Sequence, residues 1–310
     1  MKLTNQKYLK LIAQVIIIGL ALWILAPQVS ELVRNRQTIS SLSLGWLVAG
    51  LAIFLLSNIF AAYVYQYLSP KKLSFKKNVQ VQLATGFTNR LLPAGIGGIS
   101  TNSLFLMRAG YKRPQAVSIA LANNLVGFLA FGLVLVASGA LLPSSLSSIF
   151  SDTSPIYLWA TAGVVIVALA VTMFSEKFRE LIQKNLVLGI SVLKDTLARP
   201  LHLILALLSS AGIAFCFVGA LYCCLRGAGI VLSPNELMLV FLASAIATSA
   251  SPTPGGLGAA EVSMMLALDK LSIAGPPALA GVIAFRLITY WLPILPGYLF
   301  FRIVGAKRYI

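Results

Sequence analysis

Two short segments rich in glycine and proline interrupt a chain that is apolar over most of its length. The first runs from Arg90 to Gly98 and the second from Ser251 to Glu261, so each half of the chain contains one. Glycine and proline break helices, and broken backbone is tolerated at membrane depth only where protein or a cavity surrounds it. Paired breaks in the two halves of a membrane protein indicate a substrate site between two repeats. The chain therefore has the pattern of a transporter.

The composition places the chain in a membrane. Hydrophobic residues make up 58% of its 310 residues and charged residues only 10%, whereas soluble domains carry about 25% charged residues. The net charge is +16, and the basic residues gather in short loops between apolar runs, which is typical of cytoplasmic loops. This charge indicates contact with anionic lipid headgroups rather than with nucleic acid. We expect a location in the cytoplasmic, or inner, membrane.

Six apolar runs are long enough to cross a bilayer as helices. They cover residues 9–26, 44–68, 115–142, 156–174, 200–224 and 277–300. The regions 78–110 and 235–272 each contain a short helical stretch, a Gly/Pro break and a second short helical stretch, which predicts two re-entrant helical hairpins. The expected fold is an all-α polytopic membrane protein of six transmembrane helices and two hairpins. Residues 1–310 then form a single transmembrane domain, with repeat one at about 44–142 and repeat two at about 200–300.

The distribution of basic residues orients these helices. If the N-terminus is cytoplasmic, the four lysines of loop 69–77, the five basic residues of segment 175–199 and the C-terminal tail all fall on the cytoplasmic side, as the positive-inside rule requires. Three full spans separate the two hairpins, so the hairpins enter from opposite faces. The sequence therefore predicts an inverted repeat with both termini in the cytoplasm.

The breaks offer groups that suit an anion. After Gly97 and Gly98, and again after Gly255 to Gly258, we expect half-helices whose first backbone N–H groups are unpaired. Helix N-termini carry about half a positive charge and bind phosphate or carboxylate. The alternative explanation is that these glycines permit close helix packing, as small residues do in membranes.

Three charged residues lie close to the breaks in the sequence. Arg90 precedes the first break, Glu261 lies one turn into the second half-helix, and Arg286 lies in the middle of the last apolar run. A charge at membrane depth is costly and is usually functional or paired, so we expect Glu261 to pair with Arg286 or Arg90. Two interpretations stay open. Either the pair neutralises itself and stabilises the fold, or the arginines bind a headgroup phosphate and Glu261 acts as a gate or proton carrier.

Further polar and aromatic side chains complete the candidate site. Asn123 and Asn124 lie in repeat one at about the place that Arg286 holds in repeat two, and Tyr290 follows Arg286. The predicted substrate-binding residues are Arg90, Pro93, Gly97, Gly98, Asn123, Asn124, Pro254, Gly255, Gly256, Gly258, Glu261, Arg286 and Tyr290.

The sequence lacks the motifs of several other classes of protein. It has no Gly-x-x-x-x-Gly-Lys-Ser/Thr segment for ATP, a single histidine, and no paired carboxylate motif among its eight acidic residues. We therefore expect no enzymatic activity, no catalytic residues, no cofactor and no metal.

Three motifs carry a resemblance to a known family. They are Arg90-Leu-Leu-Pro-Ala-Gly-Ile-Gly-Gly, Pro254-Gly-Gly-Leu-Gly-Ala-Ala-Glu261, and Arg286-Leu-Ile-Thr-Tyr-Trp-Leu-Pro293 followed by Gly297. With these motifs the chain resembles the lysylphosphatidylglycerol synthase transmembrane, or flippase-like, family over residues 5–305. The resemblance implies movement of a lipid between leaflets and self-association as a homo-oligomer. The implied cargo is an anionic or aminoacylated phospholipid or a polyprenyl-linked phosphate.

The resemblance does not extend to lipid synthesis. The sequence ends at Ile310, and we expect no cytosolic acyltransferase domain, so aminoacyl-lipid synthase activity is not carried over. The function expected is that of a lipid flippase. The alternatives are a secondary transporter of small solutes or ions, and a non-transporting membrane partner of a lipid or glycan synthase.

Overall fold

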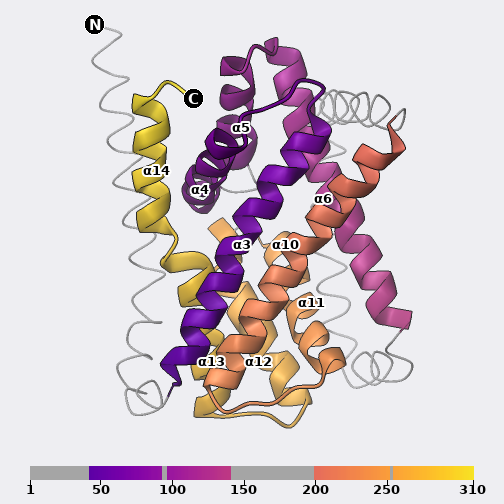
Figure 1. Cartoon of the computed structure of the whole chain (residues 1–310). Helices are drawn as coiled ribbons and strands as arrows, with labels where there is room; N and C mark the ends of the chain where they lie inside the picture. The colour runs from indigo at the N-terminus through magenta and orange to yellow at the C-terminus, as the bar shows by residue number, and fades with distance from the viewer. Residues whose placement is uncertain (1–41, 93–95, 141–198, 252–253) are drawn as a thin grey trace, which may run out of the picture.

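The structure is a computed structural model that describes residues 42–92, 96–140, 199–251 and 254–310. Every regular element in these ranges is helical, and they contain no strand. The helices form an elongated bundle (Figure 1). In chain order they are α3 (Leu44–Leu68), α4 (Phe75–Leu91), α5 (Ile96–Arg108), α6 (Arg113–Ala140), α10 (Pro200–Gly227), α11 (Pro234–Ala250), η2 (Pro254–Gly256), α12 (Ala259–Lys270), α13 (Pro276–Arg286), η3 (Leu287–Trp291) and α14 (Ile294–Ala306).

Four segments of the described chain are long and apolar enough to cross a membrane. They are Leu44–Leu68, Arg113–Val134, Pro200–Gly227 and Pro276–Ala306, and they match four of the six predicted spans. The predicted spans at 9–26 and 156–174 lie outside the described residues. The all-α class and the multi-pass membrane character are therefore confirmed.

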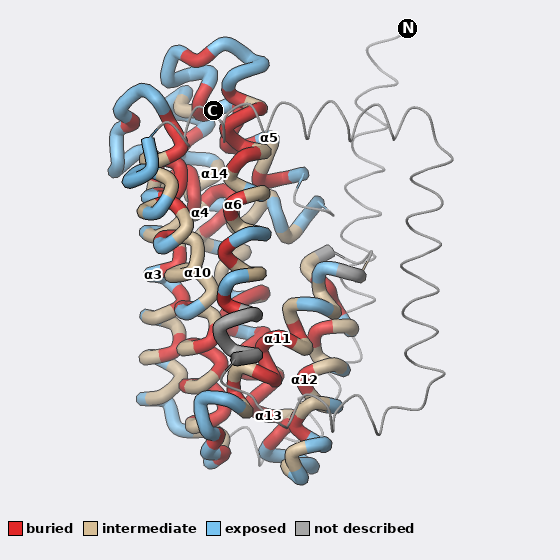
Figure 2. The backbone as a smooth tube through the Cα atoms, turned by 90° about the vertical axis from the view of Figure 1, so that its right-hand side faces the viewer, coloured by how far each residue is buried: buried red, intermediate tan, exposed pale blue. Residues whose placement is uncertain are grey.

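Each of the two interrupted regions is a helix, a break and a second helix. Region 78–110 covers most of α4 and all of α5, and region 235–272 covers nearly all of α11, the 3₁₀ turn η2 and α12. In each region the two helices pack against each other. The α4–α5 hairpin lies in the upper half of the bundle and the α11–α12 hairpin in the lower half (Figures 1 and 2).

The same order of helix lengths occurs twice in the chain. Helices α3, α4, α5 and α6 have 25, 17, 13 and 28 residues. Helices α10, α11 and α12 have 28, 17 and 12 residues, and the last span, Pro276–Ala306, has 31. The two halves therefore share one pattern of long helix, broken hairpin and long helix.

Helices α3 and α10 pack together along most of their length and run antiparallel (Figure 1). The backbone N–H of Ser43 donates to the Gly227 carbonyl at 3.0 Å, which joins the start of α3 to the end of α10. A Cβ atom at Gly212 would lie 2.8 Å from the Phe60 ring. Small residues at such contacts let membrane helices approach closely, so this pair is the central seam between the halves.

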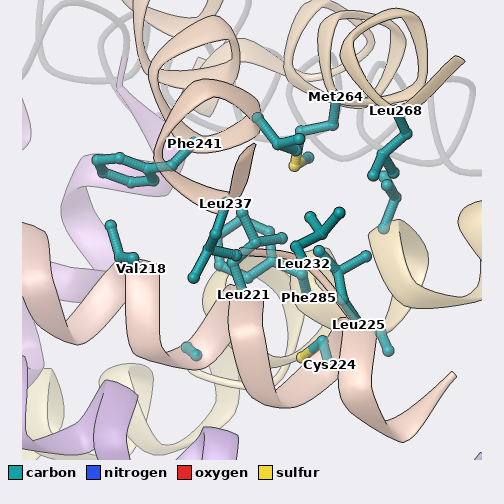
Figure 3. Packing of buried hydrophobic residues seen from close by; sticks show 14 of the residues in the cluster. Val218, Leu221, Cys224, Leu225, Leu232, Leu237, Phe241, Met264, Leu268 and Phe285 are labelled. Atoms are coloured by element: carbon teal, nitrogen blue, oxygen red, sulfur yellow. The ribbon is translucent and has the colours of Figure 1, made fainter. Parts of the chain in front are cut away.

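The core of the second half is apolar. Side chains from α10, α11, α12 and α13 meet in one cluster (Figure 3). It includes Leu221, Leu225, Leu237, Phe241, Met264, Leu268 and Phe285. This packing holds α12 and α13 next to each other, and thereby fixes the positions of the charged residues that they carry.

Candidate functional site

Arg286 and Glu261 form a salt bridge at the second break. The Arg286 Nε atom lies 2.7 Å from Glu261 Oε1, and its Nη2 donates to the Gly255 carbonyl at 3.1 Å. Arg286 is only 8% exposed. A charge buried at this depth requires a partner, so the predicted pairing of Glu261 with Arg286 is confirmed.

The second oxygen of Glu261 binds the start of α12. The backbone N–H of Gly258 donates to Glu261 Oε2 at 2.8 Å. A carboxylate in this place satisfies one of the free N–H groups of a helix start and interacts favourably with the helix dipole. Glu261 therefore connects the half-helix after the break to the arginine of the last span.

Two positions of the second break require glycine, because their backbone has a positive φ and because neighbouring atoms leave no room for a Cβ. Gly255 and Gly256 have φ values of 62° and 65°, which residues other than glycine rarely adopt. A Cβ atom at Gly255 would lie 2.2 Å from the Tyr290 ring, and one at Gly256 would lie 2.6 Å from Thr248 Cα. The break thus packs directly against the aromatic ring that follows Arg286.

Arg90 reaches from the first hairpin into the last span. Its guanidinium donates to the Gly86 carbonyl of its own helix and to the Thr289 carbonyl. Thr289 lies four residues before Pro293, which has no N–H to complete the usual helical hydrogen bond. Arg90 therefore donates to the Thr289 carbonyl, which in a regular α-helix would accept from the backbone N–H of residue 293.

Tyr290 lies between the two arginines. Its ring centroid is 4.9 Å from Arg286 Cζ and 5.8 Å from Arg90 Cζ, both within the range of cation–π attraction. Its hydroxyl donates to the Arg90 carbonyl at 3.3 Å. We call Arg90, Gly255, Glu261, Arg286 and Tyr290 the junction cluster, because it joins residues of both breaks.

The last span changes its helical form at this cluster. Residues Leu287–Trp291 form a π-helical turn, and the Leu292 N–H donates to the Leu287 carbonyl five residues earlier at 2.8 Å. Such turns adjust membrane helices near proline and occur frequently at functional sites. The turn presents Arg286 and Tyr290 to the two breaks.

The first break has its own side-chain cap. The Gly98 N–H donates to Asn89 Oδ1 at 2.5 Å, and a Cβ atom at Gly97 would lie 2.2 Å from the Thr88 carbonyl oxygen. Together with the bond from Gly258 to Glu261, this shows that the expectation of unpaired N–H groups is wrong at Gly98 and Gly258. Side chains of the protein already occupy these two donors, as expected where an amide or carboxylate oxygen lies beside a helix start.

The junction cluster does not contain all of the predicted site residues. Asn123 is half-buried and Asn124 exposed on α6, which packs against α3, α5 and α10. Within the described chain neither forms a hydrogen bond with the cluster. Pro93 lies outside the described residues, and Pro254 opens the turn η2.

A row of buried polar side chains joins α4 to α5, and the sequence reasoning missed it. Gln82 Nε2 donates to Asn78 Oδ1 at 3.0 Å and to Asn102 Oδ1 at 2.8 Å. Asn102 Nδ2 donates to Thr85 Oγ1 at 3.2 Å. We call these four residues the polar ladder. The spacing of Asn78, Gln82 and Thr85 by four and three residues was the available signal, because such residues share one face of a helix.

The charges of the junction cluster do not cancel. Two guanidinium groups and one carboxylate leave a net charge of +1, and no other carboxylate among the described residues lies within salt-bridge distance of either arginine. In addition, Arg90 Nε is buried and has no hydrogen-bond partner there. The described residues also contain no group of His, Cys, Asp and Glu that could hold a metal ion. The cluster is thus suited to an anion.

The geometry defines a helical membrane protein whose two broken hairpins meet at a positively charged cluster. Residues 11–297 match the family described as the lysylphosphatidylglycerol synthase TM region. The chain belongs to this family, and all residues of the junction cluster lie within the matched range. Among curated proteins, none matches the chain.

Proposed function

We propose that the protein moves a lipid with an anionic phosphate headgroup from one leaflet to the other. The observation that carries this proposal is the uncompensated positive charge of the junction cluster, which brings together one arginine beside each helix break. Guanidinium groups bind phosphate oxygens through charge-assisted hydrogen bonds. The headgroup would be held by Arg90 and Arg286 while the acyl chains remain in the bilayer.

The Glu261 carboxylate competes with the headgroup phosphate for Arg286. Its carboxylate occupies Arg286 Nε at 2.7 Å and the Gly258 N–H at 2.8 Å. A headgroup phosphate could take the place of this carboxylate on Arg286, because both are oxyanions that accept the same hydrogen bonds. Glu261 would then act as a gate that closes the site when no lipid is bound, and as a candidate proton carrier when it is released.

The arrangement of the hairpins supports access from both leaflets. We propose that α4–α5 and α11–α12 are re-entrant, that they belong to inverted repeats, and that they open alternately to the two sides of the membrane. Basic residues cluster where α3 joins α4 and where α5 joins α6, in the segments 71–77 and 108–113. By the positive-inside rule this end, with both termini, would face the cytoplasm of the inner membrane.

The proposal requires no covalent chemistry. We propose that the protein is not an enzyme and binds a phospholipid or polyprenyl-phosphate lipid without changing it. Movement would follow the lipid gradient or the entry of a proton at Glu261.

The test is lipid translocation in proteoliposomes that contain fluorescent phosphatidylglycerol. A reductant added outside bleaches only the outer leaflet, so protein that moves lipid increases the bleached fraction. We expect Arg90→Gln to lower the rate towards that of protein-free vesicles, while Arg302→Gln, which changes an exposed arginine of α14, leaves it unchanged. An unchanged rate in a folded Arg90→Gln variant would contradict the proposal. A wild-type protein that moves no lipid would favour a transporter of small solutes.

A further inference from the structure

A second group of hydrogen-bond donors lies far from the junction cluster, where α10 ends beside the start of α3. Arg226 is in the last turn of α10, Tyr222 is one turn earlier, and Trp46 is in the first turn of α3. The bond from the Ser43 N–H to the Gly227 carbonyl, 3.0 Å long, holds these two helix ends together. We call Trp46, Tyr222 and Arg226 the Arg226 cluster.

Two aromatic rings hold the Arg226 guanidinium in place. Arg226 Cζ lies 5.6 Å from the centroid of the Trp46 ring and 6.0 Å from that of the Tyr222 ring. The two rings meet edge to face at 5.9 Å. Cation–π contacts of this kind restrict the guanidinium without using its N–H groups. The side chain is therefore fixed in position, with its donors available.

The donors of this cluster have no acceptor in the described part of the protein. Neither the guanidinium of Arg226, the indole N–H of Trp46 nor the hydroxyl of Tyr222 forms a hydrogen bond with a described residue, and Arg226 has no carboxylate within salt-bridge distance there. All three residues are half-buried, and none of their polar atoms is among those that are both buried and unpaired. These donor groups are consequently open to an external acceptor.

An apolar stripe on α10 leads to this cluster. Leu201, Leu208 and Phe215 are 64%, 62% and 57% exposed, and Tyr222 follows Phe215 at the same spacing of seven residues. Residues seven apart lie on nearly the same face of a helix. An acyl chain lying along this stripe would bring its headgroup to Tyr222 and Arg226.

We infer that the Arg226 cluster binds the phosphate of a membrane lipid at the end of the bundle opposite the basic segments 71–77 and 108–113. Aromatic side chains with a polar edge favour the membrane–water interface, and arginine binds phosphate oxygens in a fixed geometry. The same donors suit free phosphate, but the apolar stripe favours the lipid. This site is separate from the junction cluster, so it does not depend on the proposed translocation.

The test is native mass spectrometry of the full-length protein, purified in detergent and titrated with phosphatidylglycerol. We expect Arg226→Gln to remove one bound lipid, or to weaken its binding about tenfold, since a charge-assisted hydrogen bond is lost. Trp46→Leu should have a similar effect, because the guanidinium loses one of its two aromatic contacts. The matched control is Lys77→Gln, which removes a cation held over the Tyr309 ring at the other end, with Nζ 4.9 Å from the centroid.

Two results would overturn the inference. The first is full retention of lipid by Arg226→Gln, which would show that Arg226 only packs between the rings and compensates the C-terminal dipole of α10. The second is displacement by inorganic phosphate of the one lipid that distinguishes the wild-type protein from Arg226→Gln, at a concentration that leaves the lipids still bound to Arg226→Gln in place. That displacement would assign the donors to a soluble anion. A wild-type protein that binds this lipid but does not move lipid between leaflets would count only against the function proposed for the junction cluster.

Discussion

The two broken hairpins have the same shape but different interiors. Between α4 and α5 lie Asn78, Gln82 and Asn102, of which Asn78 and Asn102 are at most 1% exposed, joined by side-chain hydrogen bonds. In the second hairpin, apolar side chains such as Phe241 of α11 and Met264 of α12 belong to one buried cluster (Figure 3). Apolar side chains of the first hairpin, such as Val81 and Leu106, are also buried in a hydrophobic cluster. The first hairpin thus adds side-chain hydrogen bonds to van der Waals packing, whereas the second relies on packing.

The tips of the two hairpins are built alike, although the interiors differ. A side-chain oxygen caps the second half-helix in each, from Asn89 to Gly98 and from Glu261 to Gly258. The cap is neutral in the first hairpin and negatively charged in the second, where it also pairs with Arg286. The second tip therefore carries a charged cap, as the proposed gate requires, whereas the first tip has a neutral cap and contributes the cation of Arg90.

The largest effect is expected when the tips lose their glycines. Gly97→Ala and Gly255→Ala would each place a Cβ 2.2 Å from another atom, and Gly255 also has a positive φ. We expect Gly255→Ala to lose more than about 3 kcal/mol of stability, from overpacking and backbone strain, and Gly97→Ala to lose about 3 kcal/mol, from overpacking alone. A thiol-reactive dye can report unfolding, because Cys216, Cys223 and Cys224 are free and buried.

The control for both glycine variants is Gly305→Ala. A Cβ at Gly305 has no other atom within 4 Å, so this change should be neutral or slightly stabilising in a helix. If Gly97→Ala unfolds at the same temperature as the wild-type protein, the first tip is not packed as closely as the second, and the two tips are not alike in this respect.

The next largest effect tests the apolar interior of the second hairpin. Met264 of α12 is fully buried in the apolar cluster, and Met264→Ala should cost about 2–5 kcal/mol through the cavity it leaves. Leu266→Ala on the same helix changes a side chain that is 61% exposed and should cost far less. Equal thermal stabilities for the two variants would show that this interior does not hold the hairpin.

A smaller effect is expected in the polar interior of the first hairpin. Asn102→Ala removes the acceptor of Gln82 and the donor to Thr85. We expect a loss of about 1–2 kcal/mol, since hydrogen bonds between membrane helices are individually modest. Leu104→Ala, at an exposed position of α5, is the matched control. A loss as large as that of Met264→Ala would remove the energetic difference between the two interiors.

The smallest effect is expected from the Tyr290 hydroxyl in the junction cluster. Tyr290→Phe removes the hydroxyl that donates to the Arg90 carbonyl at 3.3 Å but keeps the ring between the two arginines. The stability should change by less than about 1 kcal/mol, and the translocation rate should stay close to that of the wild type. Tyr290→Leu removes the aromatic face and should slow translocation. The reverse order of effects would assign the role of Tyr290 to its hydroxyl.

The sequence predicted the long helices because their signal is continuous. The span predicted at 44–68 coincides with α3, and the breaks lie where glycine and proline cluster. The pairing of Glu261 with Arg286 could also be predicted, since few partners exist for a charge at membrane depth.

Contacts between distant segments were harder to predict. The bond from Arg90 to the Thr289 carbonyl depends on the absence of an N–H at Pro293 and on the meeting of two hairpins from different halves. The caps at Gly98 and Gly258 depend on side-chain rotamers, which helix propensity does not determine. The proline at position 293 indicates from the sequence that the Thr289 carbonyl lacks its α-helical hydrogen bond, but it does not indicate that Arg90 is the group that donates to this carbonyl.

The most direct test of the central claim uses the double variant Glu261→Gln/Arg286→Gln. Each single variant leaves an unpaired buried charge and should lose about 3–5 kcal/mol of stability, whereas the neutral double variant should recover much of it. We predict that the folded double variant no longer moves fluorescent phosphatidylglycerol in proteoliposomes, because the phosphate has lost Arg286. Translocation by the double variant at the wild-type rate would contradict the account and reduce the salt bridge to a structural role.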